Sequence, residues 1–256
     1  MSNKLVMNFS RQNELVKYKD FKDKSITIIG AGATGSNLAI ALAKIGFAQP
    51  NYGELKVIDY DNVSIHNLSN QYFFPNQIGM KKVVALKENL KVFDCKAVAI
   101  DKKIISEDID CIKDINANLI ILAVDDNDSR RDIMENIIPY CNKCQTVIEP
   151  GMSLTGIMVK YHKNNNWDKV IERWLKSWIP SSEQKVSACG TTATAFPTVL
   201  GVVHYTMSSI ICHYYEYWAT EKLDSVSKPL DSIDIECYNF KGFYQKEFDS
   251  EIKLIR

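Results

Sequence analysis

Short hydrophobic runs alternate with helical patterns along the first 150 residues of the chain. The runs Ser25–Ile29, Glu54–Asp59 and Leu119–Val124 are rich in Ile, Leu and Val, and Lys96–Ile100 and Thr146–Glu149 are similar but weaker. Short apolar runs of this kind are typical of parallel strands that are buried on both faces. We therefore expect five strands in this half of the chain.

Segments with helical spacing of apolar residues lie between these runs. They are Asn37–Ile45, which Gly46 follows as a C-cap, Met80–Phe93 and Asp128–Tyr140, which ends near Pro139. Glycine favours the left-handed conformation that commonly ends a helix. Strand and helix alternate in the order of a doubly wound, Rossmann-like α/β fold with a mostly parallel sheet.

The pattern changes after Pro150. We expect a strand over Ser153–His162, a helix over Trp167–Trp178, a polar loop over Pro180–Val186 and a long apolar helix over Thr198–Thr220. The tail from Ser232 alternates apolar and polar residues and predicts one or two antiparallel closing strands. The 256 residues suit one domain, with a nucleotide-binding half at 1–152 and a second half at 153–256.

Composition limits the classes of partner. Apolar residues make up 46% and charged residues 24% of the chain, and 31 basic residues balance 31 acidic ones. A balanced charge gives no general attraction to nucleic acid or to an anionic membrane. No apolar run approaches the roughly 20 residues that span a bilayer. Seven scattered cysteines are more typical of reduced thiols than of a disulfide framework, so we expect a cytoplasmic protein.

A glycine loop follows the first predicted strand. Gly30, Gly32 and Gly35 fit the G-x-G-x-x-G pattern, and Ser36 adds a hydroxyl at the start of the next helix. Such a loop lets phosphate approach the backbone N–H groups of a helix N-terminus. Asp59 lies 24 residues after Gly35 at the end of the second strand, where an acid binds the ribose hydroxyls. Dehydrogenases share this pattern, so an NAD-dependent oxidoreductase stays an alternative here.

Four further motifs make the assignment more specific. Residues 59–71 read D-Y-D-N-V-S-I-H-N-L-S-N-Q, residues 79–82 read G-M-K-K, residues 126–131 read D-N-D-S-R-R and residues 9–12 read F-S-R-Q. Their order and spacing resemble the ThiF/MoeB family of ubiquitin-activating-enzyme-like adenylyltransferases. The resemblance covers residues 8–152 well and the rest weakly. It implies that the chain binds ATP with Mg²⁺ and adenylylates a carboxylate.

The resemblance also implies which residues form the site. Lys82 can pair with phosphate, and Asp126 at the end of a central strand suits a Mg²⁺ ligand, since Mg²⁺ prefers carboxylate oxygen and water. Each has a simpler interpretation, because Lys82 could lie on an exposed helix face and Asp126 could be a helix N-cap. The other residues that the motifs place in the nucleotide site are Asp61, Asn67, Gln71, Asn127 and Arg131, the last equally interpretable as a salt-bridge residue.

Partners follow from the same resemblance. The carboxylate is expected to be the C-terminal glycine of a small ubiquitin-like or sulfur-carrier protein, bound largely by residues 153–256. In the family an N-terminal arginine reaches the ATP of the neighbouring subunit, so Arg11 would act across a homodimer interface. Cys189 lies in the region where family members with a catalytic cysteine carry it, so it is a candidate for thioester transfer, the alternative being a buried structural thiol.

Two features do not match the family pattern. Position 70 is asparagine where the family usually has arginine, so Arg11, Lys81, Arg130 or Arg131 compensates, or turnover is slow. A catalytically degenerate nucleotide-binding scaffold is the third possibility. Cys141 and Cys144 form a C-x-x-C pair, but a closed zinc site needs four ligands and the sequence has no second pair. We therefore expect reduced cysteines and no zinc.

Overall fold

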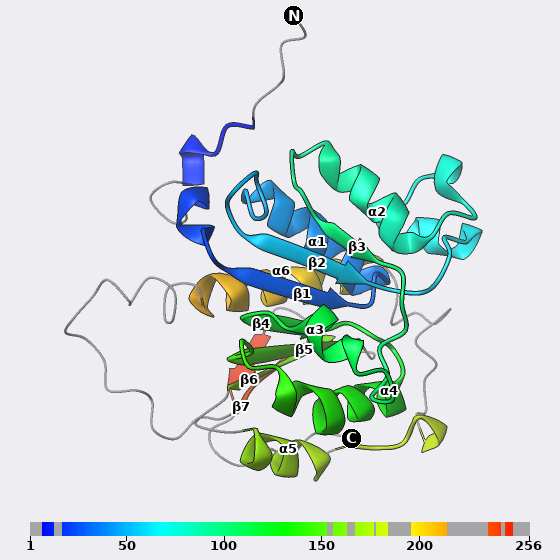
Figure 1. Ribbon diagram of the computed structural model, residues 1–256, viewed down its shortest axis with the longest axis vertical. Helices are drawn as coiled ribbons and strands as arrows, with labels where there is room; N and C mark the ends of the chain where they lie inside the picture. The colour runs from blue at the N-terminus through cyan, green and yellow to red at the C-terminus, as the bar shows by residue number, and fades with distance from the viewer. Residues whose placement is uncertain are drawn as a thin grey trace, which may run out of the picture.

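A mixed eight-stranded sheet forms the centre of the molecule in the computed structural model (Figure 1). The structure describes residues 7–12, 17–152, 156–162, 167–176, 178–183, 196–213, 235–241 and 244–247. The strands lie in the order β3-β2-β1-β4-β5-β6-β7-β8. Their bounds are β1 Ser25–Ile29, β2 Glu54–Ile58, β3 Val98–Ile100, β4 Leu119–Leu122, β5 Thr146–Met152, β6 Gly156–His162, β7 Ile235–Lys241 and β8 Tyr244–Glu247.

The direction of the strands confirms the predicted fold class. Strands β1 to β5 pair in parallel, and β6, β7 and β8 extend the sheet antiparallel from β5. The central strand β1 is buried at every position, as its continuous run of apolar and small residues predicts. Both closing strands expected from the alternating tail are present.

Helices cover both faces of the sheet. Their bounds are α1 Ala33–Lys44, α2 Lys82–Lys91, α3 Asp110–Ile115, α4 Asn127–Asp132, α5 Asp168–Leu175 and α6 Phe196–His213. One core cluster packs α1, α2 and α6 against one face of the sheet, and a second packs α3, the turn at Ile133–Ile137 that follows α4, and α5 against the other. This two-sided arrangement is why the central strands read as continuous apolar runs.

Several boundaries differ from the sequence expectation. The helix expected over Asp128–Tyr140 is α4, followed by a π-helical turn at Ile133–Ile137 and a 3-10 turn at Ile138–Tyr140. Pro139 explains the change, because a proline lacks the N–H that an α-helix needs at this point and its ring clashes with the preceding turn. The six-residue helix α3 was not expected, and β3 has three residues where five were predicted.

The cysteines of the C-x-x-C pair lie in the hydrophobic core. Cys141, Cys144 and Cys111 form no disulfide and have 0% exposure, in the core cluster that includes α3 and α5. Burial raises the pKa of Cys111. Among the described residues, no group of three or more His, Cys, Asp or Glu side chains could hold a metal ion.

Candidate nucleotide-binding site

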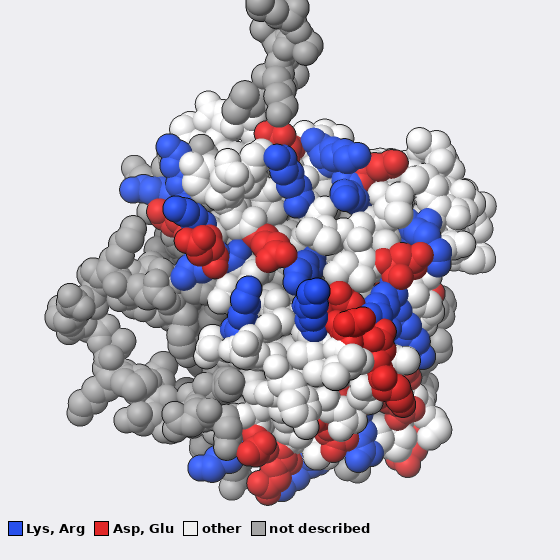
Figure 2. Space-filling model, in the orientation of Figure 1, with Lys and Arg blue, Asp and Glu red and all other residues white. Residues whose placement is uncertain are grey.

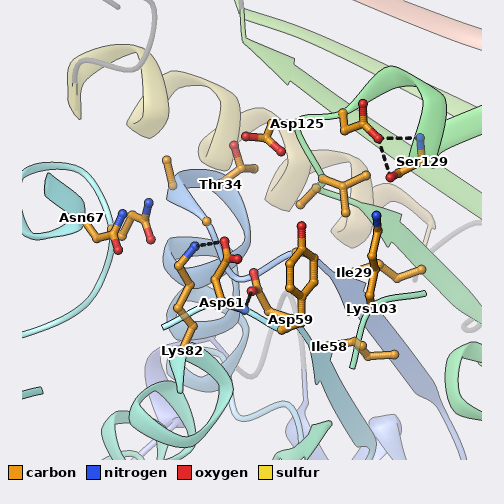
Figure 3. A pocket seen from close by; sticks show the side chains of 18 of the residues that line it. Ile29, Thr34, Ile58, Asp59, Asp61, Asn67, Lys82, Lys103, Asp125 and Ser129 are labelled. Atoms are coloured by element: carbon orange, nitrogen blue, oxygen red, sulfur yellow. Dashed lines mark hydrogen bonds and ion pairs between the residues drawn. The ribbon is translucent and has the colours of Figure 1, made fainter. Parts of the chain in front are cut away.

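A cavity of about 1090 Å³ opens at the carboxyl ends of the parallel strands (Figure 3). Ligands of open α/β sheets bind at this edge, beside the point where the strand order reverses between β1 and β4. The volume lies slightly above the roughly 300–1,000 Å³ that is usual for ligand pockets. The lining comes from the glycine loop, the segments after β2, β3 and β4, the start of α2, the first turn of α4 and the end of β5.

The three glycines of the loop have different surroundings. Gly30 has a φ of +100°, and a Cβ atom there would lie 2.6 Å from the carbonyl oxygen of Ala123. A Cβ at Gly35 would lie 1.8 Å from the carbonyl oxygen of Gly30, so α1 packs directly on the loop. A Cβ at Gly32 would meet nothing within 4 Å, and Gly32 lines the cavity. Gly30 and Gly35 therefore shape the loop, and Gly32 leaves open space for a ligand.

Asp59 is held in place by the backbone beside it. Its Oδ2 accepts a hydrogen bond of 2.6 Å from the N–H of Ala31, and its Oδ1 accepts one of 2.8 Å from the N–H of Asp61. Each carboxylate oxygen can accept about two hydrogen bonds, so both retain capacity toward the cavity. The geometry suits an acid that accepts two hydroxyl groups of a sugar.

Lys82 is at the first position of α2 and is buried, with 7% exposure. Its ammonium pairs with Asp61 Oδ2 at 2.9 Å, and both side chains line the cavity (Figure 3). The exposed-face interpretation of Lys82 is thus wrong, because the side chain turns inward. The neighbouring Lys81 instead contacts the carbonyl oxygen of Tyr60 at 2.8 Å and Asp101 at 3.2 Å.

The loop after β2 supplies polar amides. Asn67 Oδ1 accepts hydrogen bonds from the N–H and the hydroxyl of Ser64, which leaves its amide N–H groups available to the cavity that it lines. Asn70 and Gln71 line the same wall. The side-chain amide of Asn37 donates to the carbonyl oxygen of Asn70 at 2.9 Å, so α1 holds this loop against the glycine loop.

Ser36 does not reach the cavity wall. It has 0% exposure, and its hydroxyl accepts a hydrogen bond of 3.0 Å from the N–H of Tyr72. The sequence suggested this hydroxyl as a phosphate donor, because it follows the last glycine of the loop. The structure gives it a supporting position instead, in which it fixes the loop that carries Asn67 and Gln71.

Asp126 is the N-cap of α4, which is the simpler of the two interpretations of this residue. Its Oδ2 accepts hydrogen bonds from both the N–H and the hydroxyl of Ser129, and its Oδ1 accepts one from the hydroxyl of Ser181. Burial opposes ionisation, but the hydrogen bonds from Ser129 and Ser181 lower the pKa of Asp126 below its usual value. Asp126 also lines the cavity, as do Asp125 and Asn127.

The capping role leaves room for a cation. Ser129 donates two hydrogen bonds to Asp126 Oδ2, whereas the hydroxyl of Ser181 donates one to Oδ1, and a carboxylate oxygen can accept about two. Mg²⁺ commonly takes only one or two protein carboxylates and keeps several waters or phosphate oxygens. The ionised carboxylate of Asp126 at the cavity wall therefore fits a Mg²⁺ ion that arrives with a nucleotide.

The two arginines of α4 point in different directions. Arg130 lines the cavity, and its guanidinium donates to the carbonyl oxygen of Val124 at 2.8 Å and pairs with Glu149 at 2.7 Å. Arg131, which the sequence motif singled out, is outside the lining. It pairs with Glu135 on the exposed surface and lies 4.6 Å from the ring centroid of Trp178.

The sequence reasoning missed several cavity residues, among them one tyrosine and two lysines at strand ends. Tyr60 follows β2, and Lys102 and Lys103 follow β3. Lys102 pairs with Asp108 at 2.6 Å and Asp114 at 2.9 Å, and these hydrogen bonds raise its pKa. The ammonium of Lys103 lies 5.9 Å from the ring centroid of Tyr60 (Figure 3). Their position at strand ends was the available signal.

The carboxylates make this part of the cavity acidic. Partial burial raises the pKa of Tyr60, and the negative charges of the nearby carboxylates raise it further. These carboxylates are Asp61, Asp125, Asp59 and Asp126. The cavity lining thus combines these four carboxylates with the basic side chains of Lys82, Lys102, Lys103 and Arg130.

Besides Ser36 and Arg131, two further predicted site residues are not placed at the cavity. Arg11 is exposed in a short 3-10 turn at Ser10–Gln12 and does not line the cavity of this single chain. Cys189 lies outside the described residues.

Charges of both signs are mixed over the visible face of the molecule (Figure 2). Within the described part of the chain, no helix is long and apolar enough to cross a membrane.

Comparisons with known proteins relate the chain to one family and to several relatives. The sequence model of the ThiF family matches residues 3–239. Over 80 residues, 31% of the chain, it is 36% identical to ubiquitin-like modifier-activating enzyme 5 of Drosophila erecta. Over 85 residues it is 33% identical to the enzyme of the same name from Caenorhabditis briggsae. The matched regions span only 19% and 18% of the length of these relatives.

Solved structures share the fold. A crystal structure of E. coli MccB with MccA superposes with a TM-score of 0.61 at 18% identity, covering 94% of this chain and 66% of that one. The structure titled TcdA (CsdL) superposes with a TM-score of 0.60 at 19% identity, covering 85% of this chain and 96% of that one. PaaA gives a TM-score of 0.61 at 18% identity, covering 90% of this chain and 64% of that one.

Proposed function

The chain belongs to the ThiF family, and on that basis we propose that it binds ATP and uses it to adenylylate a carboxylate. The observation that carries the proposal is that one cavity brings together a glycine loop, an oriented acid, a buried lysine and an ionised capping aspartate. These are the four kinds of group that sugar, phosphate and metal binding require.

The sugar and phosphate ends of the nucleotide would lie on different elements. Asp59 would accept hydrogen bonds from the ribose hydroxyls, since the N–H groups of Ala31 and Asp61 hold it facing the cavity. Gly30 and Gly32 would let phosphate approach the first turn of α1, whose N–H groups lack partners within the helix. Asn67 and Gln71 would add amide groups from the opposite wall.

Lys82 would supply positive charge during the reaction. Its ammonium is held by Asp61 at 2.9 Å, and that partner is half exposed, so the ammonium can turn from the carboxylate toward a phosphate oxygen. In the proposed step, a carboxylate oxygen of the substrate attacks the α-phosphorus and forms a P–O bond. The bond to the bridging oxygen breaks, and pyrophosphate leaves with its electron pair. Lys82 would stabilise the negative charge that builds on the departing group.

Asp126 would hold Mg²⁺ through its Oδ1 atom, with Asn127 beside it on the cavity wall. Mg²⁺ bound with ATP neutralises phosphate charge. Of the two arginines in this segment, Arg130 is the one at the cavity, and we assign it rather than Arg131 to the site.

The substrate is proposed to be the C-terminal glycine of a small ubiquitin-like or sulfur-carrier protein. This is supported by the names of the relatives, one an activating enzyme for a ubiquitin-like modifier and one a structure of MccB with MccA. Residues 1–152 would then bind the nucleotide and residues 153–256 most of the carrier. Cys189 would take the acyl group as a thioester, with AMP leaving as its sulfur attacks the acyl carbon.

A homodimer completes the proposal. Arg11 lies outside the cavity of its own chain, which leaves it able to reach the ATP of a second copy. Such a contribution would offset the asparagine at position 70. The buried free thiols are compatible with a reducing cytoplasm.

A catalytically degenerate scaffold is the second candidate, and Asn70 is the observation that favours it. Its amide lines the cavity without the charge of the family's arginine. ATP binding without turnover would then be the natural state of the protein. The oxidoreductase alternative rested on the glycine loop alone, and the family assignment accounts for that loop.

ATP–pyrophosphate exchange tests the proposal. Purified protein, Mg²⁺ and candidate small proteins with free C-terminal glycines are incubated with labelled pyrophosphate. We expect exchange that depends on the carrier and disappears in Asp126→Ala. Asp20→Ala, which changes an exposed aspartate outside the cavity lining, should retain it. Measurable ATP binding without exchange for any carrier would support the scaffold instead.

A further inference from the structure

Residues 178–183 form a short segment, here called the anchor, that attaches to the start of α4. The indole N–H of Trp178 donates to the carbonyl oxygen of Asn127 at 3.0 Å, and the amide of Asn127 donates to the carbonyl oxygen of Ile179 at 3.1 Å. The ring of Trp178 also lies against Arg131. The anchor thus touches the same turn of chain that forms part of the cavity wall.

Ser181 makes the most direct link between the anchor and the cavity. Its hydroxyl accepts a hydrogen bond of 3.1 Å from the N–H of Asp128 and donates one to Asp126 Oδ1. The N–H of Ser181 faces Asp128 Oδ1 at 3.4 Å, which fixes the serine from a second side. Because its accepted bond points the hydroxyl hydrogen at Asp126, this serine orients Oδ1, the carboxylate oxygen that does not bond to Ser129.

We propose that Ser181 is a positioning residue that holds Asp126 Oδ1 in place for the cation accompanying ATP. The inference rests on the proposed function, since it concerns the same nucleotide site. Ser129 secures Oδ2 and Ser181 secures Oδ1, so the carboxylate cannot rotate without losing a hydrogen bond on one side. Removing a group that hydrogen-bonds to a metal-binding carboxylate typically lowers the metal affinity by about 10- to 100-fold.

The position of Ser181 in the chain gives this contact a second consequence. Ser181 belongs to the half of the chain proposed to bind the carrier, and it lies eight residues before Cys189. The nucleotide site is therefore completed from the segment that leads to the proposed acceptor thiol.

The test compares Ser181→Ala with Ser182→Ala, its exposed neighbour. The affinity for ATP is measured by isothermal titration calorimetry, once with Mg²⁺ and once with EDTA. We expect Ser181→Ala to lose about 10- to 100-fold of ATP affinity in Mg²⁺ and to keep the wild-type affinity in EDTA. Ser182→Ala and the conservative Ser181→Thr, which keeps the hydroxyl, should match the wild type in both conditions.

Two further variants separate positioning from a general loosening of the fold. In Asp126→Ala the added Ser181→Ala change should cost nothing more, because the serine acts only through that carboxylate. Trp178→Phe keeps the ring beside Arg131 but loses the indole hydrogen bond, and should give a smaller loss that is again confined to Mg²⁺.

Three results would overturn the inference. The first is that Mg²⁺ raises the affinity for ATP equally in Ser181→Ala and Ser182→Ala. The second is that Ser181→Ala loses as much ATP affinity in EDTA as in Mg²⁺. Wild-type protein that binds ATP without any gain from Mg²⁺ is the third. Wild-type protein that fails to bind ATP at all would overturn the proposed function as well, so the two failures are distinguishable.

Discussion

Gly32 and Gly35 lie three residues apart in the nucleotide loop, and their surroundings predict opposite effects of an added methyl group. A Cβ at Gly35 would lie 1.8 Å from the carbonyl oxygen of Gly30, whereas one at Gly32 meets nothing within 4 Å. Gly32 has a φ of −75°, which any residue can adopt. The difference separates the packing role of one glycine from the binding role of the other.

We expect Gly35→Ala to destabilise the protein and Gly32→Ala to leave its stability unchanged. Alanine gains about 1 kcal/mol of helix propensity over glycine, but overpacking against backbone costs about 1–3 kcal/mol or more, and at 1.8 Å the clash dominates. Thermal unfolding should show a lower melting temperature for Gly35→Ala only. Gly32→Ala should fold normally and bind ATP more weakly, because its methyl group projects into the cavity. Equal melting temperatures for the two variants would contradict this assignment.

At the scale of elements, the start of the π-helical turn is fastened to the loop before α3 by Asp132. Its carboxylate accepts a hydrogen bond of 2.8 Å from the N–H of Ser106 and another of 2.9 Å from the amide of Asn136. Burial works against ionisation, but these hydrogen bonds lower the pKa of Asp132 in the folded protein. The contact joins two elements on the same side of the sheet.

The lowered pKa gives this contact a pH dependence of known sign. An unfolded aspartate has a pKa of about 3.9, and the folded value is lower, so the stabilisation is complete above about pH 5 and is lost as the pH falls through the folded pKa. We expect Asp132→Asn to be less stable than the wild type at pH 7 and to approach it toward pH 3. Urea unfolding at a series of pH values measures this, and parallel curves for the two proteins would refute it.

The strands and helices differ in how well the sequence predicted them. Strands β1, β4 and β5 followed from apolar runs, since burial on both faces leaves little freedom in their composition. Helix α3 was missed because six residues are too few to show a helical period. Pro139 predicted that the regular helix ends in this region. The residue at which the π-helical turn begins was not predictable, because it depends on the packing of the surrounding turns.

The candidate site was predictable where a residue type is tied to a strand end or to the start of a helix. Asp59, Lys82 and Asp126 all line the cavity, as their motifs indicated. The choice between Arg130 and Arg131 was not predictable, because neighbouring helical residues point about 100° apart and the sequence does not fix the rotation of α4. The anchor contact of Ser181 could not be foreseen either, since it joins segments that are 55 residues apart.

At the scale of the whole molecule, the proposed homodimer makes a prediction that a monomeric enzyme does not. If Arg11 acts on the site of the partner subunit, each site combines Arg11 of one copy with Asp126 of the other. Arg11→Ala and Asp126→Ala should each abolish pyrophosphate exchange when assayed alone. A heterodimer of the two variants would contain one damaged site that lacks both groups and one intact site that has both.

Mixing the two inactive variants should therefore restore activity. Random re-association of equal amounts makes half of the dimers heterodimers, each with one intact site, so we expect about a quarter of the wild-type exchange rate. The mixture is assayed after dissociation and refolding together, with separately refolded variants as the control. Recovery near a quarter would place Arg11 across the interface. Persistent inactivity of the mixture, with dimers confirmed by sedimentation, would mean that Arg11 does not act across the interface. The positive charge that Asn70 lacks would then have to come from a group already in the cavity, and Arg130→Ala would be the first variant to assay.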